Sequence, residues 1–143
     1  MQNEEILWSI AEGEKENGKP YVLRFLEFYP TKTEQERLSY LIEISWDYLE
    51  ENPIGMPDQE TYELMNYFED TLDEEIISEE SSILVLTMLG DEKKLWLIYA
   101  NNPDSFMDKL NEVMEGRKVL PIQFEVFQDS DWNGYKEFIG LVK

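Results

Sequence analysis

Apolar and polar residues alternate between residues 38 and 48, the spacing of a strand with one buried face. The apolar side of this strand carries Tyr40, Ile42, Ile44, Trp46 and Tyr48. Residues 6–11 and 21–29 also have strand patterns, and the stretch between them contains two glycines and a proline. That composition is typical of a loop, so the sequence predicts an N-terminal hairpin.

A helical pattern begins after Pro57, where Asp58 has the residue type and position of an N-cap. One stripe of this helix is apolar and consists of Thr61, Leu64, Met65, Phe68 and Leu72, with Ile76 at its margin. The opposite, wet face carries Glu63, Asp70, Asp73 and Glu74. Glu69 lies at the border and could turn inward. Glu75 falls inside the apolar stripe, so either the helix ends before it or its side chain reaches outward.

The remaining chain alternates between strand and helix patterns. Further strands are predicted at residues 82–89, 94–100 and 119–127. Before the last of them, Asn102 and Pro103 mark the start of a helix, and Gly116 marks its end. The tail predicts a short helix that extends to Leu141.

From residue 38 onward the order is strand, helix, strand, strand, helix, strand, the split β-α-β order (βαββαβ) of ferredoxin-like folds. We therefore expect an α+β sandwich, in which two helices cover one face of a four-stranded antiparallel sheet, preceded by the N-terminal β-hairpin. The chain reads as a single domain. Its expected parts are the hairpin at 1–30, the ferredoxin-like core at 38–128 and a tail at 129–143.

The strand at residues 82–89 conflicts with this topology. It would form an edge of the sheet, yet both of its faces are apolar. Exposed edges of that kind invite aggregation. We expect the edge to be covered, either by the N-terminal hairpin or by a second copy of the chain in a homodimer.

Composition excludes several chemistries. The 143 residues include neither cysteine nor histidine, so disulfides, thiolate nucleophiles and imidazole bases are impossible. No phosphate-binding loop, nucleophile motif or EF-hand spacing is present, and we expect no catalytic residue, metal site or cofactor. No apolar run approaches the roughly 20 residues of a membrane span, and the first residues are acidic, unlike a secretory signal. A cytoplasmic location is expected.

Negative charge is concentrated in one part of the chain. There are 32 acidic and 12 basic residues, for a net charge of −20, and sixteen of the acids lie in residues 38–92, which contain no lysine or arginine. We call residues 38–92 the base-free segment. Nucleic acids and anionic membranes repel such a surface, so neither is expected as a partner. A basic protein is the partner that this charge favours.

Five carboxylates lie in residues 67–75, and three interpretations of them are open. They could be the solvated face of a helix, a docking surface for a basic partner, or a catalytic or metal site. Because most of them diverge around the helix, the first interpretation is the simplest. Glu69 and Asp70 are the candidate binding residues.

Aromatic pairs recur at strand or turn spacing: Trp46 with Tyr48, Trp96 with Tyr99, and Trp132 with Tyr135. They could pack in the core, with their polar atoms reaching partners, or form the rim of a groove. Trp132 is the strongest candidate for a rim residue, because Asp131 and Asn133 flank it. We count Trp46, Tyr48, Trp96, Trp132 and Tyr135 as candidate binding residues.

Several of these segments resemble a bacterial family catalogued as a domain of unknown function, number 695 in its series. The matching segments are 44–48 (ISWDY), 55–57 (GMP), 68–72 (FEDTL), 87–90 (TMLG), 96–99 (WLIY) and 131–135 (DWNGY). The resemblance covers roughly residues 29–138 and brings no catalytic residue with it. It favours a role beyond solvation for Glu69, Asp70 and Trp132.

A more distant similarity is to the regulator of ribonuclease activity, type B. Its members share a ferredoxin-like core, strong negative charge and a late Trp-x-x-Tyr, which here is Trp132 and Tyr135. They bind and inhibit a ribonuclease, so this resemblance also implies a protein partner.

Three functional hypotheses follow. The first is a non-enzymatic interaction or regulatory domain that binds a basic partner. The second is a small-molecule-binding domain or minor enzyme whose pocket is lined by Trp46, Trp96, Trp132 and Glu69. The third is a surface that binds divalent cations weakly.

Overall fold

The computed structural model describes residues 8–27, 30–48, 55–78 and 80–140. In these residues six strands form one antiparallel sheet in the order β1-β2-β4-β5-β3-β6. The strands are β1 (Trp8–Glu14), β2 (Pro20–Leu26), β3 (Tyr40–Asp47), β4 (Ser82–Gly90), β5 (Lys93–Ala100) and β6 (Ile122–Gln128). The helices are α1 (Lys32–Arg37), α2 (Gln59–Thr71), the π-helix η1 (Leu72–Ile76), α3 (Pro103–Met114) and α4 (Asn133–Gly140).

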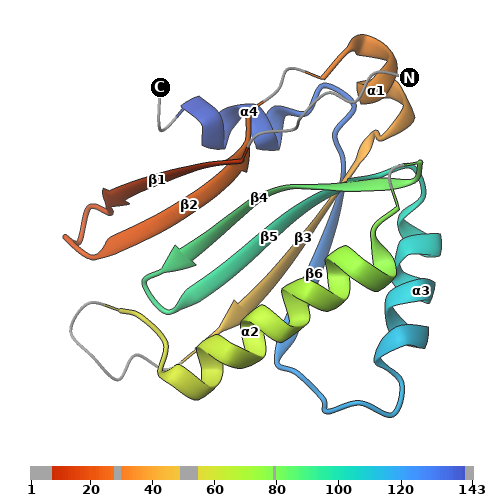
Figure 1. The fold of residues 1–143 in the computed structure, drawn as a ribbon. Coiled ribbons are helices and arrows are strands. Elements are labelled where there is room, and N and C mark those ends of the chain that lie inside the picture. The colour runs from red at the N-terminus through yellow and green to blue at the C-terminus, as the bar shows by residue number, and fades with distance from the viewer. Residues whose placement is uncertain (1–7, 28–29, 49–54, 79, 141–143) are drawn as a thin grey trace.

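Helices cover both faces of the sheet (Figure 1). One apolar cluster joins α2, η1 and α3 to inward side chains of β3 and β5 such as Ile44 and Trp96. A second cluster on the opposite face joins α4 to β2, β4 and β5, through residues such as Leu23, Leu97 and Tyr135. Two cores explain why β4 and β5 are apolar on both sides.

The α+β class is confirmed, but the ferredoxin-like sandwich is not confirmed as such. The sheet has six strands where four were expected, and α4 covers a face that the expected arrangement left open. Both differences have one physical cause. The apolar side chains of β4 that point away from α2, including Val85 and Leu86, need a core of their own, and the hairpin and the tail supply it.

The N-terminal hairpin covers the apolar strand, as one of the two sequence-based alternatives predicted. Strand β2 pairs with β4 from Val22 opposite Leu89 to Phe25 opposite Leu86. A homodimer through the 82–89 edge stays a prediction, although β2 occupies part of that edge. The predicted strand ends at residues 6–7 and 28–29, and the predicted helix end at Leu141, lie outside the described residues.

Helix α2 begins and packs as the pattern predicts. The Asp58 carboxylate accepts a hydrogen bond from the backbone N–H of Thr61 at 2.8 Å, which caps the helix. The residues of its apolar stripe that become fully buried are Met65, Phe68, Leu72 and Ile76. All four residues assigned to the wet face, Glu63, Asp70, Asp73 and Glu74, are exposed.

The π-helix η1 resolves the conflict at Glu75. Its hydrogen bond runs from the N–H of Ile77 to the carbonyl of Leu72 at 2.8 Å, which places an extra residue in the turn. The wider turn rotates Glu75 out of the apolar stripe and Ile76 into it. Glu75 then pairs with Arg117 at 3.1 Å.

Helix α1 was not predicted. Thr31 accepts from the N–H of Glu34, and the Glu34 side chain accepts from the N–H of Thr31, which makes a capping box. The sequence signal for it, Thr-x-x-Glu, was present but spans only one short turn.

Candidate functional site

Glu69 points from α2 toward the sheet, where two hydrogen-bond donors and one further cation meet its carboxylate. Arg24 of β2 donates to it at 2.9 Å, and the indole N–H of Trp96 of β5 donates at 3.0 Å. The Lys94 ammonium lies 3.6 Å from the same carboxylate. We call these four residues the Glu69 cluster.

Partial burial strengthens the electrostatic interactions within this cluster. The side chain of Glu69 is 15% exposed and that of Lys94 is 9% exposed, whereas that of Arg24 is 37% exposed. Burial lowers the pKa of Lys94, the carboxylate of Glu69 raises it, and the nearby Arg24 lowers it. The carboxylate therefore partly offsets the cost of burying the Lys94 ammonium, and its contacts with Arg24, Lys94 and Trp96 join α2 to β2 and β5.

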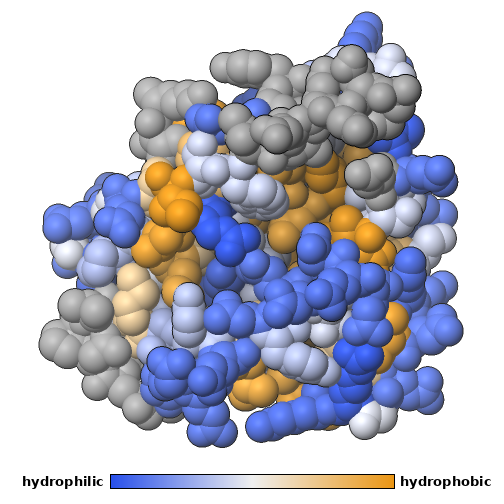
Figure 2. Space-filling model, viewed as in Figure 1, coloured by the Kyte–Doolittle hydropathy of each residue, from blue (hydrophilic) through white to orange (hydrophobic). Residues whose placement is uncertain are grey.

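A second group of carboxylates lies on the outer side of α2 and η1. We call it the acidic face, and it consists of Glu60, Glu63, Asp70, Asp73 and Glu74, all exposed. Among the described residues, no lysine or arginine comes within 4.0 Å of any of them. Mostly hydrophilic residues lie over α2 in the space-filling view (Figure 2).

Trp132 and Tyr135 belong to the core beneath α4. The Trp132 ring stacks on Tyr99 with centroids 4.1 Å apart, and its indole N–H donates to the Leu38 carbonyl at 2.8 Å. The Tyr135 hydroxyl donates to the Leu26 carbonyl. Both aromatic residues are buried, so they connect α4 to two other segments of the chain.

Tyr99 links this core to the loop before α4. Its hydroxyl donates to the Asp129 carboxylate at 2.7 Å and accepts from the N–H of Tyr135 at 3.1 Å. Burial, with the hydrogen bond to Asp129 next, raises the pKa of Tyr99 far above its ordinary value. Gly134 lies close to Leu41, because an added Cβ would lie 2.7 Å from a methyl carbon of that side chain and would displace it.

The other aromatic candidates lie across the sheet. Trp46 and Trp96 pack against each other with centroids 6.5 Å apart, and Phe68 of α2 meets Trp96 at 5.0 Å. The hydroxyl of Tyr48 donates to the Gly55 carbonyl at 2.6 Å. The structure therefore divides the candidate aromatic residues between two cores and does not gather them around one pocket. That these residues bind a ligand or partner stays a prediction.

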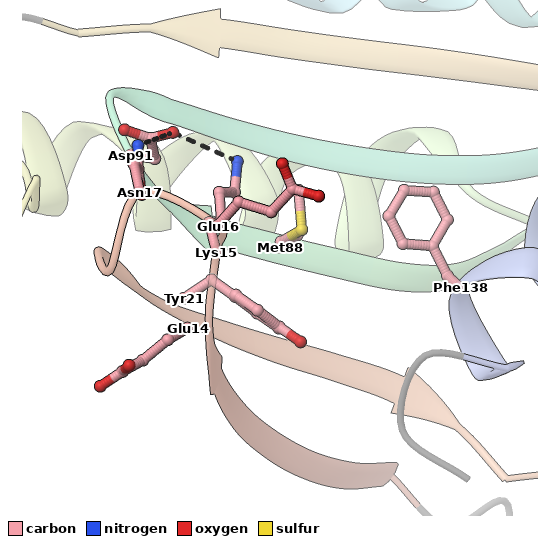
Figure 3. Close-up of a pocket in the computed structure, with 8 residues that line it drawn as sticks. All are labelled: Glu14, Lys15, Glu16, Asn17, Tyr21, Met88, Asp91 and Phe138. Carbon is pink, nitrogen blue, oxygen red and sulfur yellow. Dashed lines mark hydrogen bonds and ion pairs between the residues drawn. The ribbon is translucent and has the colours of Figure 1, made fainter.

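The surface does contain a hollow of about 630 Å³, at a place that the sequence did not indicate (Figure 3). Its lining consists of Glu14, Lys15, Glu16, Asn17, Tyr21, Met88, Asp91 and Phe138, none of them a candidate from the sequence. Asp91 lies 3.7 Å from Lys15 and from Lys19, and it accepts a hydrogen bond from Asn17 at 3.2 Å. The lining comes from three separated segments, so no local motif could reveal it.

The described residues contain no group of three or more acidic side chains placed to hold a metal ion. None of their helices has the length and apolar character needed to cross a membrane.

Comparison with protein families identifies the class of this protein. The chain belongs to the Family of unknown function (DUF695), whose model matches residues 8–139. This confirms the family resemblance of the sequence, while the more distant similarity to the ribonuclease regulator stays a prediction. Neither a curated protein nor a solved structure matches the chain.

The segments that carry the family resemblance make contacts that hold the fold together. Tyr48 meets Gly55, and Gly55 has a positive φ of 75° and packs so closely on Asp91 that an added Cβ would lie 3.2 Å from its Cα. Glu69 meets Trp96, and Trp132 meets Tyr99. These contacts give a structural role to at least one residue in five of the six segments.

Proposed function

We propose that this protein is a non-enzymatic interaction domain that binds a basic partner through its acidic face. The supporting observation is a difference within the base-free segment. Glu69, Glu75 and Asp91 each pair with a cation from elsewhere in the chain, whereas the five residues of the acidic face have no such partner within the described residues. Unpaired surface charge of one sign speeds the encounter with an oppositely charged protein.

The C-terminal part of the acidic face also destabilises the helix that carries it. Asp70, Asp73 and Glu74 lie near the end of α2 and in η1, where the helix dipole disfavours negative charge. Asp70 is three residues from Asp73 and four from Glu74, so these carboxylates repel one another. A cationic partner would relieve both effects, and salt would weaken its binding.

Capture from the native lysate tests this proposal with three baits. One is the natural chain, and the second carries Glu60→Gln, Glu63→Gln, Asp70→Asn, Asp73→Asn and Glu74→Gln. The control neutralises five exposed acids elsewhere: Glu16, Glu36, Glu125, Asp131 and Glu137. Both variants have a net charge of −15 in place of −20.

We expect a protein that the natural chain and the control retain at low salt and release at high salt, and that the acidic-face variant does not retain. Equal retention by the two variants would show that net charge alone attracts the protein, and would contradict the proposal.

We also propose that β3 to β6, with α2 and α3, form a ferredoxin-like unit to which the hairpin is added. The order of these four strands, β4-β5-β3-β6, supports this proposal. The cytoplasm is the setting we propose, and the absence of cysteine fits a reducing compartment. We do not propose the aromatic pocket, because its three tryptophans lie in two separate cores.

A further inference from the structure

Strand β1 is one edge of the sheet, and it presents a patterned row of side chains. Trp8 is 41% exposed and Ile10 is 68% exposed, and Glu12 and Glu14 continue the same row. The side chains between them point to the other face of the sheet. An apolar area over β1 and β2 is visible beside a strongly hydrophilic group in Figure 2.

Within the part of the chain that the structure describes, the outer backbone groups of β1 are available to pair with another strand. Lys15 N–H donates to the Lys19 carbonyl at 2.9 Å in the turn of the hairpin. Hydrogen-bonded and non-hydrogen-bonded pairs alternate along an antiparallel ladder. The alternation therefore directs the N–H and C=O groups of Glu14, Glu12 and Ile10 away from β2. No other strand of the described residues covers this edge.

The order of the row defines the partner that it fits. From Trp8 to Glu14 the row reads apolar, apolar, acidic, acidic. An antiparallel strand would match it with two basic side chains followed by two apolar ones, at a spacing of two residues. A second copy of this chain fits poorly, because self-pairing around Ala11 would place Ile10 opposite Glu12 and bring together two chains of charge −20.

The opposite edge of the sheet lacks such a row. Strand β6 exposes 46% of Val126 and 41% of Phe127, but adjacent residues of a strand point to opposite faces. Glu125 lies on the same side as Phe127 and next to Glu43 of β3. The edge of β6 therefore offers no continuous apolar and acidic stripe.

We propose that the outer edge of β1 binds an extended segment of another protein, with alternating basic and then apolar side chains, by strand addition. Backbone hydrogen bonds would supply much of the affinity, and the row from Trp8 to Glu14 would supply the selectivity. This surface is distinct from the acidic face of α2.

The test uses the peptide acetyl-Lys-Thr-Lys-Thr-Val-Thr-Phe-amide and a control in which glutamate replaces both lysines. Calorimetry measures affinity, and backbone NMR locates the bound peptide. Glu12→Pro removes one outward N–H and obstructs the edge, while edge strands tolerate proline. Glu12→Gln is the matched variant that keeps the N–H, and the NMR spectrum reports whether each variant is folded.

We expect the lysine peptide to shift the amides of Ile10 and Glu12 and the glutamate peptide to leave them unchanged. Glu12→Pro should weaken binding by about tenfold, and Glu12→Gln by about threefold. The acidic-face variant should bind the peptide within about twofold of the natural chain, so this test is independent of the proposed function.

Three outcomes would overturn the proposal. They are chemical shift changes on β6 or α2 in place of β1, undiminished binding to the folded Glu12→Pro variant, and self-association of the chain through β1.

Discussion

Glu69 and Asp70 are consecutive residues of α2, yet Glu69 is largely buried against the sheet and Asp70 is exposed to solvent. The Glu69 side chain is 15% exposed, and its carboxylate contacts Arg24, Lys94 and Trp96. Asp70 is exposed and, within the described residues, has no cation within reach. A rotation of about 100° around the helix axis thus separates a carboxylate that holds the fold together from one that only adds charge to the surface.

The comparison shows that the number of acids in a sequence says little about what each of them does. A carboxylate that meets buried cations contributes to stability, since its loss would leave those cations unpaired. A carboxylate in water contributes almost nothing to stability, or lowers it through repulsion by its neighbours. The following substitutions test this division, and the stability change expected from each is smaller than that from the one before.

Glu69→Gln should have the largest effect. Breaking a buried ion pair costs about 3–5 kcal/mol, and because this site is only partly buried we expect a loss of about 2 kcal/mol. The measurement is the free energy of unfolding in urea. Asp70→Asn is the control, and it should change that free energy by less than about 0.5 kcal/mol. Equal effects of the two substitutions would contradict the different roles assigned to Glu69 and Asp70.

Lys94→Met removes one of the three partners of Glu69 and should therefore destabilise the protein at neutral pH. The loss should be only about 1 kcal/mol, because Glu69 keeps Arg24 and Trp96 as partners. The pH dependence is more specific. Burial lowers the pKa of Lys94 in the folded chain. Between that lowered pKa and a pH of about 10.4, the unfolded chain therefore keeps a proton on Lys94 that the folded chain has lost. The natural chain should therefore gain stability over Lys94→Met as pH rises toward that value.

The ionisation of Tyr99 is common to both chains and cancels in this difference. A difference in unfolding free energy that stays constant across the alkaline range would contradict the assigned burial of Lys94.

Neutralising Asp70, Asp73 and Glu74 together should stabilise the protein by about 0.5–1 kcal/mol at low salt, through the relief of repulsion and of the helix dipole. The gain should shrink at high salt, because screening already weakens both terms. Thermal unfolding at two salt concentrations measures it. A loss of stability would mean that these residues make contacts that support the fold.

Glu43→Gln should have the smallest effect. Burial, and then the facing carboxylate of Glu125, raise the pKa of Glu43 above its ordinary value. A raised carboxyl pKa lowers stability at pH values above it and has no effect below the unfolded pKa of about 4.3. The melting temperature should therefore rise slightly at pH 7 and be unchanged at acidic pH. A rise that persists at acidic pH would show that the effect does not come from the charge of Glu43.

The sequence predicted what depends on local spacing. The apolar stripe of α2, its cap at Asp58 and the start of α3 at Asn102 all follow from residues within one or two turns. The cover on β4 was also predictable, because a strand that is apolar on both faces needs neighbours on both sides.

Local patterns could not reveal contacts between distant segments. The partners of Glu69 come from β2 and β5, and only the strand order brings both beneath α2. Trp132 looked exposed because its sequence neighbours are polar, yet a tight turn with a φ of 58° at this residue turns its ring into the core. The wide turn of η1, which moves Glu75 outward, likewise depends on packing around Ile76.

The most direct measurement is partner retention by the acidic-face variant and by Glu69→Gln, at a temperature where both are folded. We expect the acidic-face variant to be stable but to retain no partner, and Glu69→Gln to be less stable but to retain the partner as the natural chain does. If the folded Glu69→Gln variant loses the partner while the acidic-face variant keeps it, the roles assigned to the two groups of carboxylates are wrong.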